Sequence, residues 1–152
     1  MKNVFKIIFV FGIVLLATGC GTKVVTCTIK NDQSGSGYSI DSTYEIYSKK
    51  DNVSTVEIKE VITSKNNTTL AYFEDKLKKK YEELNKLYKG YTVKTKSEKG
   101  KVIVTATADY SKIDVEKFAN ANDVIKDDIK KSKKMTSDIA KKYYESLGAS
   151  CK

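Results

Sequence analysis

The chain has 152 residues, a mass of 17.0 kDa and a formal net charge of +9, and it contains no His, Trp or Pro. All 28 of its basic residues are Lys. Without His the chain lacks the most frequent general base and metal ligand, and without Arg it lacks bidentate phosphate clamps. These absences exclude most enzyme chemistry. We therefore predict a protein that is not an enzyme and that uses neither a cofactor nor a metal ion.

The start of the chain has the pattern of a signal peptide. Lys2 and Lys6 form a short basic region, and residues 7–17 are apolar apart from one Gly. This apolar stretch is too short to span a bilayer comfortably, so we predict that residues 1–19 are removed on export. Residues 20–152 are then enough for a single compact domain with one core.

The residues Leu16-Ala17-Thr18-Gly19-Cys20, directly after the apolar stretch, resemble the lipobox of bacterial lipoproteins. In that family the Cys receives a diacylglyceryl group and the chain is cut before it. The resemblance implies that Cys20 is lipidated and holds the protein on the extracytoplasmic face of the cell membrane, since two acyl chains suffice for stable anchoring. Lipoboxes usually have Leu three places before the Cys, where this chain has Ala17. Ordinary cleavage after Ala17 or Gly19, leaving a free Cys20, is the alternative.

The remaining two cysteines lie near opposite ends of the exported chain. If Cys20 is lipidated, Cys27 and Cys151 are left over, and an exported chain can keep a disulfide. We predict a Cys27–Cys151 disulfide, with two free thiols as the alternative. Only residues 21–23 separate Cys20 from the first predicted strand, so we expect a domain of residues 24–152 close to the membrane surface.

Apolar and polar residues alternate in three early segments, which predicts strands at residues 24–30, 43–48 and 53–64. In the first strand Val25, Cys27 and Ile29 share one face, which places Cys27 on the buried side. A polar loop at residues 31–37 and a turn at residues 50–52 separate the strands. In the third strand Glu60 falls on the apolar side, and we interpret it as an edge position or a β-bulge.

The clearest helix follows residues 66–69, which offer N-caps, and stops before Gly90. Within it, apolar residues recur at spacings of three and four, namely Leu70, Phe73, Leu77, Tyr81, Leu84 and Tyr88. Strands at residues 91–96 and 101–109 then form a hairpin. Residues 113–118 are expected to form a short helical turn, and residues 124–134 are ambiguous.

A last helix, capped by Thr136 or Ser137, has an apolar stripe and ends at Gly148; the stripe is Ile139, Ala140, Tyr143 and Leu147. The order of elements is β-β-β-α-β-β-α. Clean alternation in the strands predicts an α+β fold, in which an antiparallel sheet of about five strands has helices packed on one face and water on the other.

Several segments, in their order along the chain, resemble the YehR-like family of small bacterial lipoproteins. Besides the signal and the lipobox, the resemblance rests on residues 55–60, 80–84, 88–93, 109–114 and 143–152. It implies a one-domain α+β fold at the cell surface. The family carries no assigned molecular function, so no catalytic residue is implied.

Two features bear on binding. The ten tyrosines suggest carbohydrate stacking, but packing is the better interpretation because five of them lie on predicted core faces, namely Tyr44, Tyr81, Tyr88, Tyr91 and Tyr143. Tyr47 and Tyr72 are the ones expected to be exposed.

The basic run of Lys130, Lys131, Lys133 and Lys134 is a candidate contact with an anionic surface, and a solvated charged turn is the alternative. Nucleic acid is a poor fit because Arg is absent and the location is outside the cytoplasm.

Together these features predict a lipid-anchored extracytoplasmic protein that acts as a non-enzymatic binding or scaffold module at the cell envelope. Its partners would be the membrane, through the diacylglyceryl anchor, and an anionic lipid, a wall polymer or another envelope protein. The alternative is a carrier of a small ligand or ion that uses a pocket or the exposed sheet face. An unrecognised hydrolase is the least favoured of the three.

Overall fold

The computed structural model describes residues 21–152. The predicted signal peptide, residues 1–19, and the predicted lipidation site, Cys20, lie outside the described residues. The described elements follow the order β1 (Thr22–Gln33), β2 (Tyr38–Lys49), β3 (Asn52–Ser64), α1 (Asn67–Tyr88), β4 (Tyr91–Glu98), β5 (Lys101–Asp109), α2 (Val115–Asn120), α3 (Asp123–Ser132), α4 (Ser137–Ser146) and β6 (Ser150–Cys151). A short 3-10 turn, Ser34–Ser36, joins β1 to β2.

The strands form one six-stranded sheet in the order β4-β5-β3-β2-β1-β6, and every neighbouring pair is antiparallel. The predicted α+β fold with its β-β-β-α-β-β-α order is therefore confirmed, and the short β6 adds a sixth strand. β1 begins at Thr22, two residues before the predicted start. The predicted loop at residues 31–37 shrinks to residues 34–37, because β1 continues to Gln33 and β2 begins directly at Tyr38.

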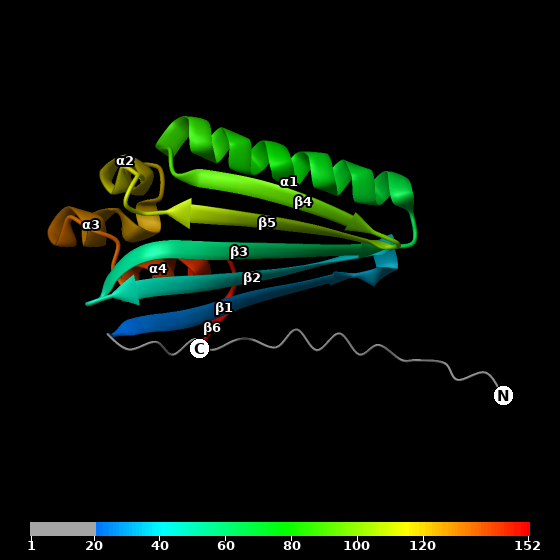
Figure 1. Ribbon diagram of the computed structural model, residues 1–152. Helices are drawn as coiled ribbons and strands as arrows, with labels where there is room; N and C mark the ends of the chain where they lie inside the picture. The colour runs from blue at the N-terminus through cyan, green and yellow to red at the C-terminus, as the bar shows by residue number, and fades with distance from the viewer. Residues whose placement is uncertain (1–20) are drawn as a thin grey trace.

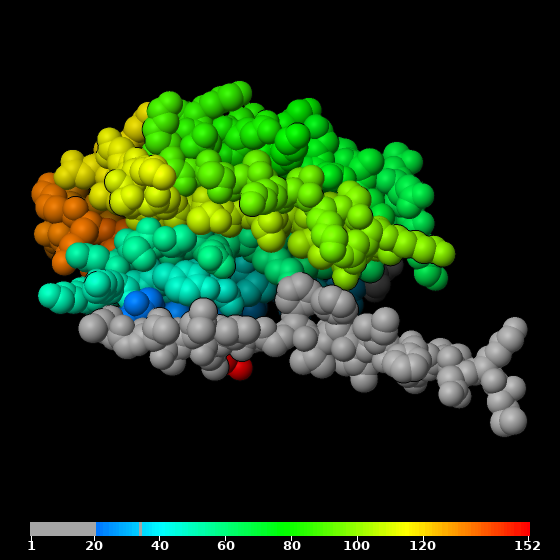
Figure 2. Space-filling view, in the orientation of Figure 1, coloured from blue at the N-terminus to red at the C-terminus, as the bar shows by residue number. Residues whose placement is uncertain are grey.

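The helices pack on one face of the sheet. In Figure 1, α1 runs along the β4 side of the sheet, α4 lies behind β2 and β3, and α2 and α3 gather at one end. The core lies between these helices and the alternate strand residues that face them. Its largest fully buried side chains include Ile46, Val56, Ile62, Tyr81 and Ile125. On the other face no helix of residues 21–152 covers β2, β3 and β5, whose side chains contribute to the surface seen in Figure 2.

Helix boundaries follow local capping. The side chain of Asn66 accepts hydrogen bonds from the backbone of Thr68 and Thr69, and Thr136 caps α4 in the same way through Ile139. The ambiguous segment at residues 124–134 is largely the helix α3, which buries Ile125 and Ile129. The predicted stripe of the last helix was wrong at Leu147, which is 50% exposed, because α4 ends before it and buries Tyr144 instead.

Candidate functional site

Cys27 and Cys151 are joined by a disulfide. The two residues are direct partners in the antiparallel pairing of β1 with β6, and backbone hydrogen bonds in both directions between Thr26 and Lys152 flank them. Cys27 is fully buried, whereas Cys151 is partly exposed. The bond therefore holds the end of the chain, and with it α4, against the first strand.

The four lysines of the predicted anionic-surface contact lie at the end of the molecule where α3 passes into α4. All four are exposed. Lys130 lies 3.8 Å from a carboxylate oxygen of Asp127, and Lys133 lies 3.2 Å from one of Glu116. Such exposed pairs contribute little stability, but they reduce the positive charge that this segment presents.

A second pair of lysines, which the sequence interpretation missed, joins this segment. Lys49 ends β2 and Lys50 begins the tight turn into β3. The turn is held to the connection between α3 and α4 by hydrogen bonds from Val53 N to Met135 O at 2.9 Å and from Ser137 N to Asp51 O at 3.2 Å. The sequence shows Lys49 and Lys50 as adjacent basic residues beside a turn. Only the fold, however, places them close to the basic segment between α3 and α4.

The start of β1 lies at the same end of the sheet. Thr22 pairs with Lys49, and Lys23 pairs with Ser48, whose hydroxyl donates to the Lys23 carbonyl at 3.3 Å. Figure 1 shows β1 beginning beside the turn between β2 and β3, at the end where α3 lies. We call this region the basic end, defined by the exposed residues Lys23, Lys49, Lys50, Lys133 and Lys134.

The backbone at the basic end adopts conformations that favour Gly or Asn. Lys50, Asp51 and Lys133 have φ values of 46°, 65° and 60°, in the left-handed region. In a tight hairpin these places are usually taken by Asn-Gly or Gly-Gly, and a helix usually ends on Gly. Residues held in such sparsely populated backbone conformations cluster at active sites and ligand clamps.

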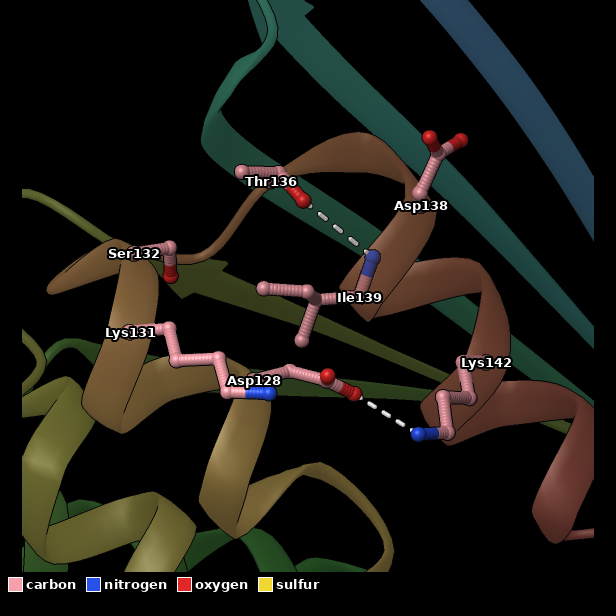
Figure 3. A pocket seen from close by; sticks show the side chains of 7 residues that line it. All are labelled: Asp128, Lys131, Ser132, Thr136, Asp138, Ile139 and Lys142. Atoms are coloured by element: carbon pink, nitrogen blue, oxygen red, sulfur yellow. Dashed lines mark hydrogen bonds and ion pairs between the residues drawn. The ribbon is translucent and has the colours of Figure 1, made fainter.

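A shallow depression opens between α3 and α4. It has a volume of about 560 Å³ and is lined by Asp128, Lys131, Ser132, Thr136, Asp138, Ile139 and Lys142. Figure 3 shows Asp128 and Lys142 pointing toward each other across it, with 2.7 Å between the carboxylate and the ammonium. This pairing lowers the pKa of Asp128. Because the lining holds two acidic and two basic residues, the depression offers no marked preference for a charged ligand.

Glu60 faces the core, as its place on the apolar side of the strand predicted, but the interpretation of an edge position or a β-bulge was wrong. β3 is an inner strand of the sheet, and its pairing with β2 and β5 is regular at Glu60. The Glu60 side chain is 5% exposed and lies 3.2 Å from the Lys80 ammonium of α1. The helix thus supplies the charge partner that the sequence pattern could not show.

The tyrosines are mainly core residues. Tyr44, Tyr81, Tyr88 and Tyr91 are buried as predicted, Tyr143 is partly buried, and Tyr72 is 58% exposed. Tyr47, which was expected to be exposed, is only partly exposed, and its hydroxyl donates to a carboxylate oxygen of Glu45 at 2.9 Å. Burial, with a smaller effect from Glu60, raises the pKa of Tyr44 to about 12. The Tyr44 hydroxyl therefore stays protonated. The rings of the buried tyrosines fill the core.

The face of the sheet without helices is polar and of mixed charge. One row across the strands, read from the pairing, consists of Thr28, Thr43, Lys59, Thr105 and Lys94. The next row places Glu45 directly beside Glu57. Alternating hydroxyls, ammonium groups and carboxylates are typical of a solvated antiparallel face.

Within residues 21–152 no helix is long and apolar enough to cross a membrane. In the same part of the chain, no group of three or more His, Cys, Asp or Glu residues is arranged to hold a metal ion.

The fold resembles that of a solved bacterial protein. The NMR structure of the YehR protein of E. coli matches 86% of this chain and 92% of its own, with a TM-score of 0.51 and 17% identity. An NMR structure of a protein from Streptococcus pneumoniae TIGR4 matches 100% of this chain and 99% of its own, with a TM-score of 0.42 and 14% identity. The chain therefore has a YehR-like fold. No protein-family model and no curated protein matches it.

Proposed function

We propose that this protein is a lipid-anchored, extracytoplasmic lipoprotein of the YehR-like family, which acts as a non-enzymatic binding module with its basic end against the membrane. The lipobox-like residues before Cys20 and the YehR-like fold support the first part. The observation that carries the second part is the position of the basic end, beside the start of β1 and therefore beside Cys20 in the sequence.

The charge of the basic end suits an anionic bilayer. Each Lys near an anionic leaflet contributes about 1 kcal/mol, and the attraction decays over a Debye length of about 8 Å at physiological salt. The diacyl chains alone suffice to retain the protein. The role of the lysines is to orient it, with the strands directed away from the membrane and the opposite end of the sheet presented outward.

Lipidation is tested by mass spectrometry of the protein extracted from membranes. Diacylglyceryl on Cys20 is expected, and a Cys20→Ser variant should appear unmodified in the medium. Release of the unmodified wild-type protein into the medium would show that the chain is an ordinary secreted protein.

Orientation by the basic end is tested by measuring how the Cys20→Ser protein binds to vesicles containing phosphatidylglycerol. This substitution removes the lipid anchor and changes no residue of the core. Binding is expected at low salt and should weaken at physiological salt. Changing Lys49, Lys50, Lys133 and Lys134 to Gln should remove most of it, and the same change at Lys130 and Lys131 should add a smaller loss.

A matched control changes four exposed lysines away from the basic end and the cleft at the opposite end of the sheet to Gln, namely Lys30, Lys76, Lys78 and Lys94. This control alters the net charge equally and should retain most of the binding. Equal losses in the two variants would mean that net charge alone causes the attraction, and no binding of the wild-type chain at low salt would remove the role of the basic end altogether.

A second function, the carriage of a small ligand, is favoured by one observation. A cleft of about 990 Å³ lies at the end of the sheet opposite the basic end, at the ends of β1 and β3 and the start of β2. On the proposed orientation this cleft faces away from the membrane.

A further inference from the structure

The cleft opposite the basic end, which we call the distal cleft, is formed by three connections that are far apart in the sequence. These are the link from β1 to β2 with Gly37, the link from β3 to α1 with Lys65, and the turn from β4 to β5 with Lys99 and Gly100. Its volume of about 990 Å³ is at the upper end of the range of about 300–1,000 Å³ for small-molecule sites. β1 has 12 residues and spans about 40 Å, which separates the distal cleft from the basic end.

Ser64 fixes the base of the distal cleft. It is 5% exposed, and its hydroxyl donates to the Gly37 carbonyl at 2.8 Å and accepts from the backbone of Asn66 at 3.1 Å. Its own backbone N–H donates to the Gly100 carbonyl at 3.1 Å. One buried residue therefore ties all three connections together, so that the cleft is formed before any ligand arrives.

The charges around the distal cleft favour an anion. Lys65 and Lys99 are exposed at its rim, and neither has an ion-pair partner within residues 21–152. The acidic residue in the lining is Asp32, which has an interaction of its own. The lining therefore holds two ammonium groups and one carboxylate, and this excess of positive charge favours carboxylate or phosphate groups.

The rest of the lining favours a hydroxylated ligand. Ser39, Thr63 and Asn67 offer hydroxyl and amide groups that both donate and accept hydrogen bonds. On the helix side of the sheet, opposite to Ser39 and Thr63, the ring of Tyr38 is held in place by Phe73, with 4.7 Å between the ring centroids, and supplies an apolar surface for the C–H face of a sugar. Among the described residues, no Leu, Ile, Val, Met or Phe lines the cleft, so a wholly apolar ligand would leave these polar groups unpaired.

We propose that the distal cleft binds an anionic saccharide, a short run of sugar units that carry carboxylate groups. Lys65 and Lys99 bind the carboxylates, the hydroxyl and amide groups bind the sugar hydroxyls, and Tyr38 packs against a sugar ring. This site is separate from the basic end and does not depend on it. If the chain is anchored as proposed, the opening faces outward, where polymers of the envelope are within reach.

The test measures binding of trigalacturonate to the purified, processed protein by titration calorimetry, with maltotriose as a neutral sugar and sulfate as an anion without a sugar. Trigalacturonate should bind, and its binding should shift the amide resonances of Gly37 and Gly100. Maltotriose and sulfate should each bind at least about tenfold more weakly, because each offers only part of the contacts.

The variant Lys65→Gln/Lys99→Gln should weaken trigalacturonate binding by about tenfold or more, because it removes both charge-assisted contacts. The matched control Lys78→Gln/Lys94→Gln makes the same change in net charge at exposed positions outside the cleft and should bind like the wild type. No binding of trigalacturonate, equal binding of sulfate, or equal losses in the two variants would each overturn the proposal. None of these results depends on lipidation or on vesicle binding. A failure of the saccharide proposal would therefore leave the proposed function unaffected, and the reverse is also true.

Discussion

Lys80 covers the buried carboxylate of Glu60 from the side of α1, with 3.2 Å between the ammonium and the nearer carboxylate oxygen. The other oxygen of Glu60 is buried and has no hydrogen-bond partner among the described residues. The Lys80 ammonium also donates to the hydroxyl of Tyr81 at 3.4 Å, which is the outer limit for such a bond. Burial and the nearby carboxylate raise the pKa of the Tyr81 hydroxyl, which therefore stays protonated. The ammonium of Lys80 is thus the principal compensation for a charge inside the core.

Removing Lys80 should therefore destabilise the fold. Lys80→Met leaves the Glu60 carboxylate buried without a charge partner, and we expect a loss of about 1–3 kcal/mol in the free energy of unfolding. The double variant Glu60→Met/Lys80→Met should recover most of this loss, because replacing both partners of a buried pair by apolar groups is often neutral. Urea unfolding of the two single variants and the double variant gives the coupling energy.

The neighbouring residue provides a matched control. Lys79 lies 2.7 Å from Asp75, but both side chains are more than half exposed, at 66% and 62%. Lys79→Met should therefore change the free energy of unfolding by no more than about 0.5 kcal/mol. Similar losses of unfolding free energy for Lys79→Met and Lys80→Met would show that the ion pair with Lys80 does not stabilise the buried Glu60 carboxylate.

The disulfide should contribute more than any single ion pair. Cys27 and Cys151 are 124 residues apart, and closing so long a loop stabilises a fold by up to about 4–5 kcal/mol in the chain-entropy model, often less in practice. The variant Cys151→Ser should therefore lower the free energy of unfolding by a few kcal/mol at most. A thiol reagent should label neither cysteine in the folded, oxidised protein, and stoichiometric labelling of both would contradict the bond.

The strands and α1 could be predicted because their sequences carry strong periodic signals. Val25, Cys27 and Ile29 alternate with polar residues, and the α1 stripe keeps its spacing from Leu70 to Tyr88. The segment at residues 124–134 was ambiguous because it offers only two well-buried positions among many charges. Its N-cap, Asn122, makes no side-chain cap hydrogen bond, and Lys133 ends it in place of Gly. The helix therefore lacks the Gly that usually marks a helix end, although Asn122 and Asp123 are residue types typical of a helix start.

The remaining differences come from tertiary packing. Tyr144 belongs to the core because it stacks on Tyr44, with 4.3 Å between the ring centroids, which no pattern within α4 reveals. Glu60 is tolerated in a central strand because Lys80 lies above it. The basic end and the distal cleft each combine connections that are distant in the sequence, so their residues could be read from the sequence but their proximity could not.

Gly90 is required by its surroundings as well as by its backbone. It has a φ of +75°, and a Cβ atom there would lie 2.7 Å from the backbone oxygen of Asp109. Gly148 has a φ of +93° but no atom within 4 Å of such a Cβ. Gly148→Ala should cost about 1–2 kcal/mol for the left-handed conformation alone, and Gly90→Ala should cost clearly more. Equal losses in urea unfolding would mean that the contact with Asp109 relaxes freely.

The turn that follows β5 should make stability depend on pH in the acid range. Hydrogen bonds from Lys112 and Ser111 lower the pKa of Asp109 to about 2, whereas an unfolded chain has an Asp pKa of about 3.9. The Ser111 hydroxyl donates to the carboxylate at 2.6 Å, and the Lys112 ammonium lies 2.8 Å from it. Because the folded protein binds this proton more weakly, the contribution of Asp109 is complete above about pH 4 and is lost as the pH falls toward about 2.

Urea unfolding between pH 2 and pH 6 measures this contribution. Asp109→Asn should lower stability near neutral pH and should make the decline between about pH 4 and pH 2 shallower than in the wild type. The control Asp127→Asn removes a carboxylate that is 85% exposed and lies 3.8 Å from Lys130. It should leave both the stability and its acid slope close to those of the wild type. An unchanged slope in Asp109→Asn would show that the hydrogen bonds of this turn do not favour the ionised carboxylate.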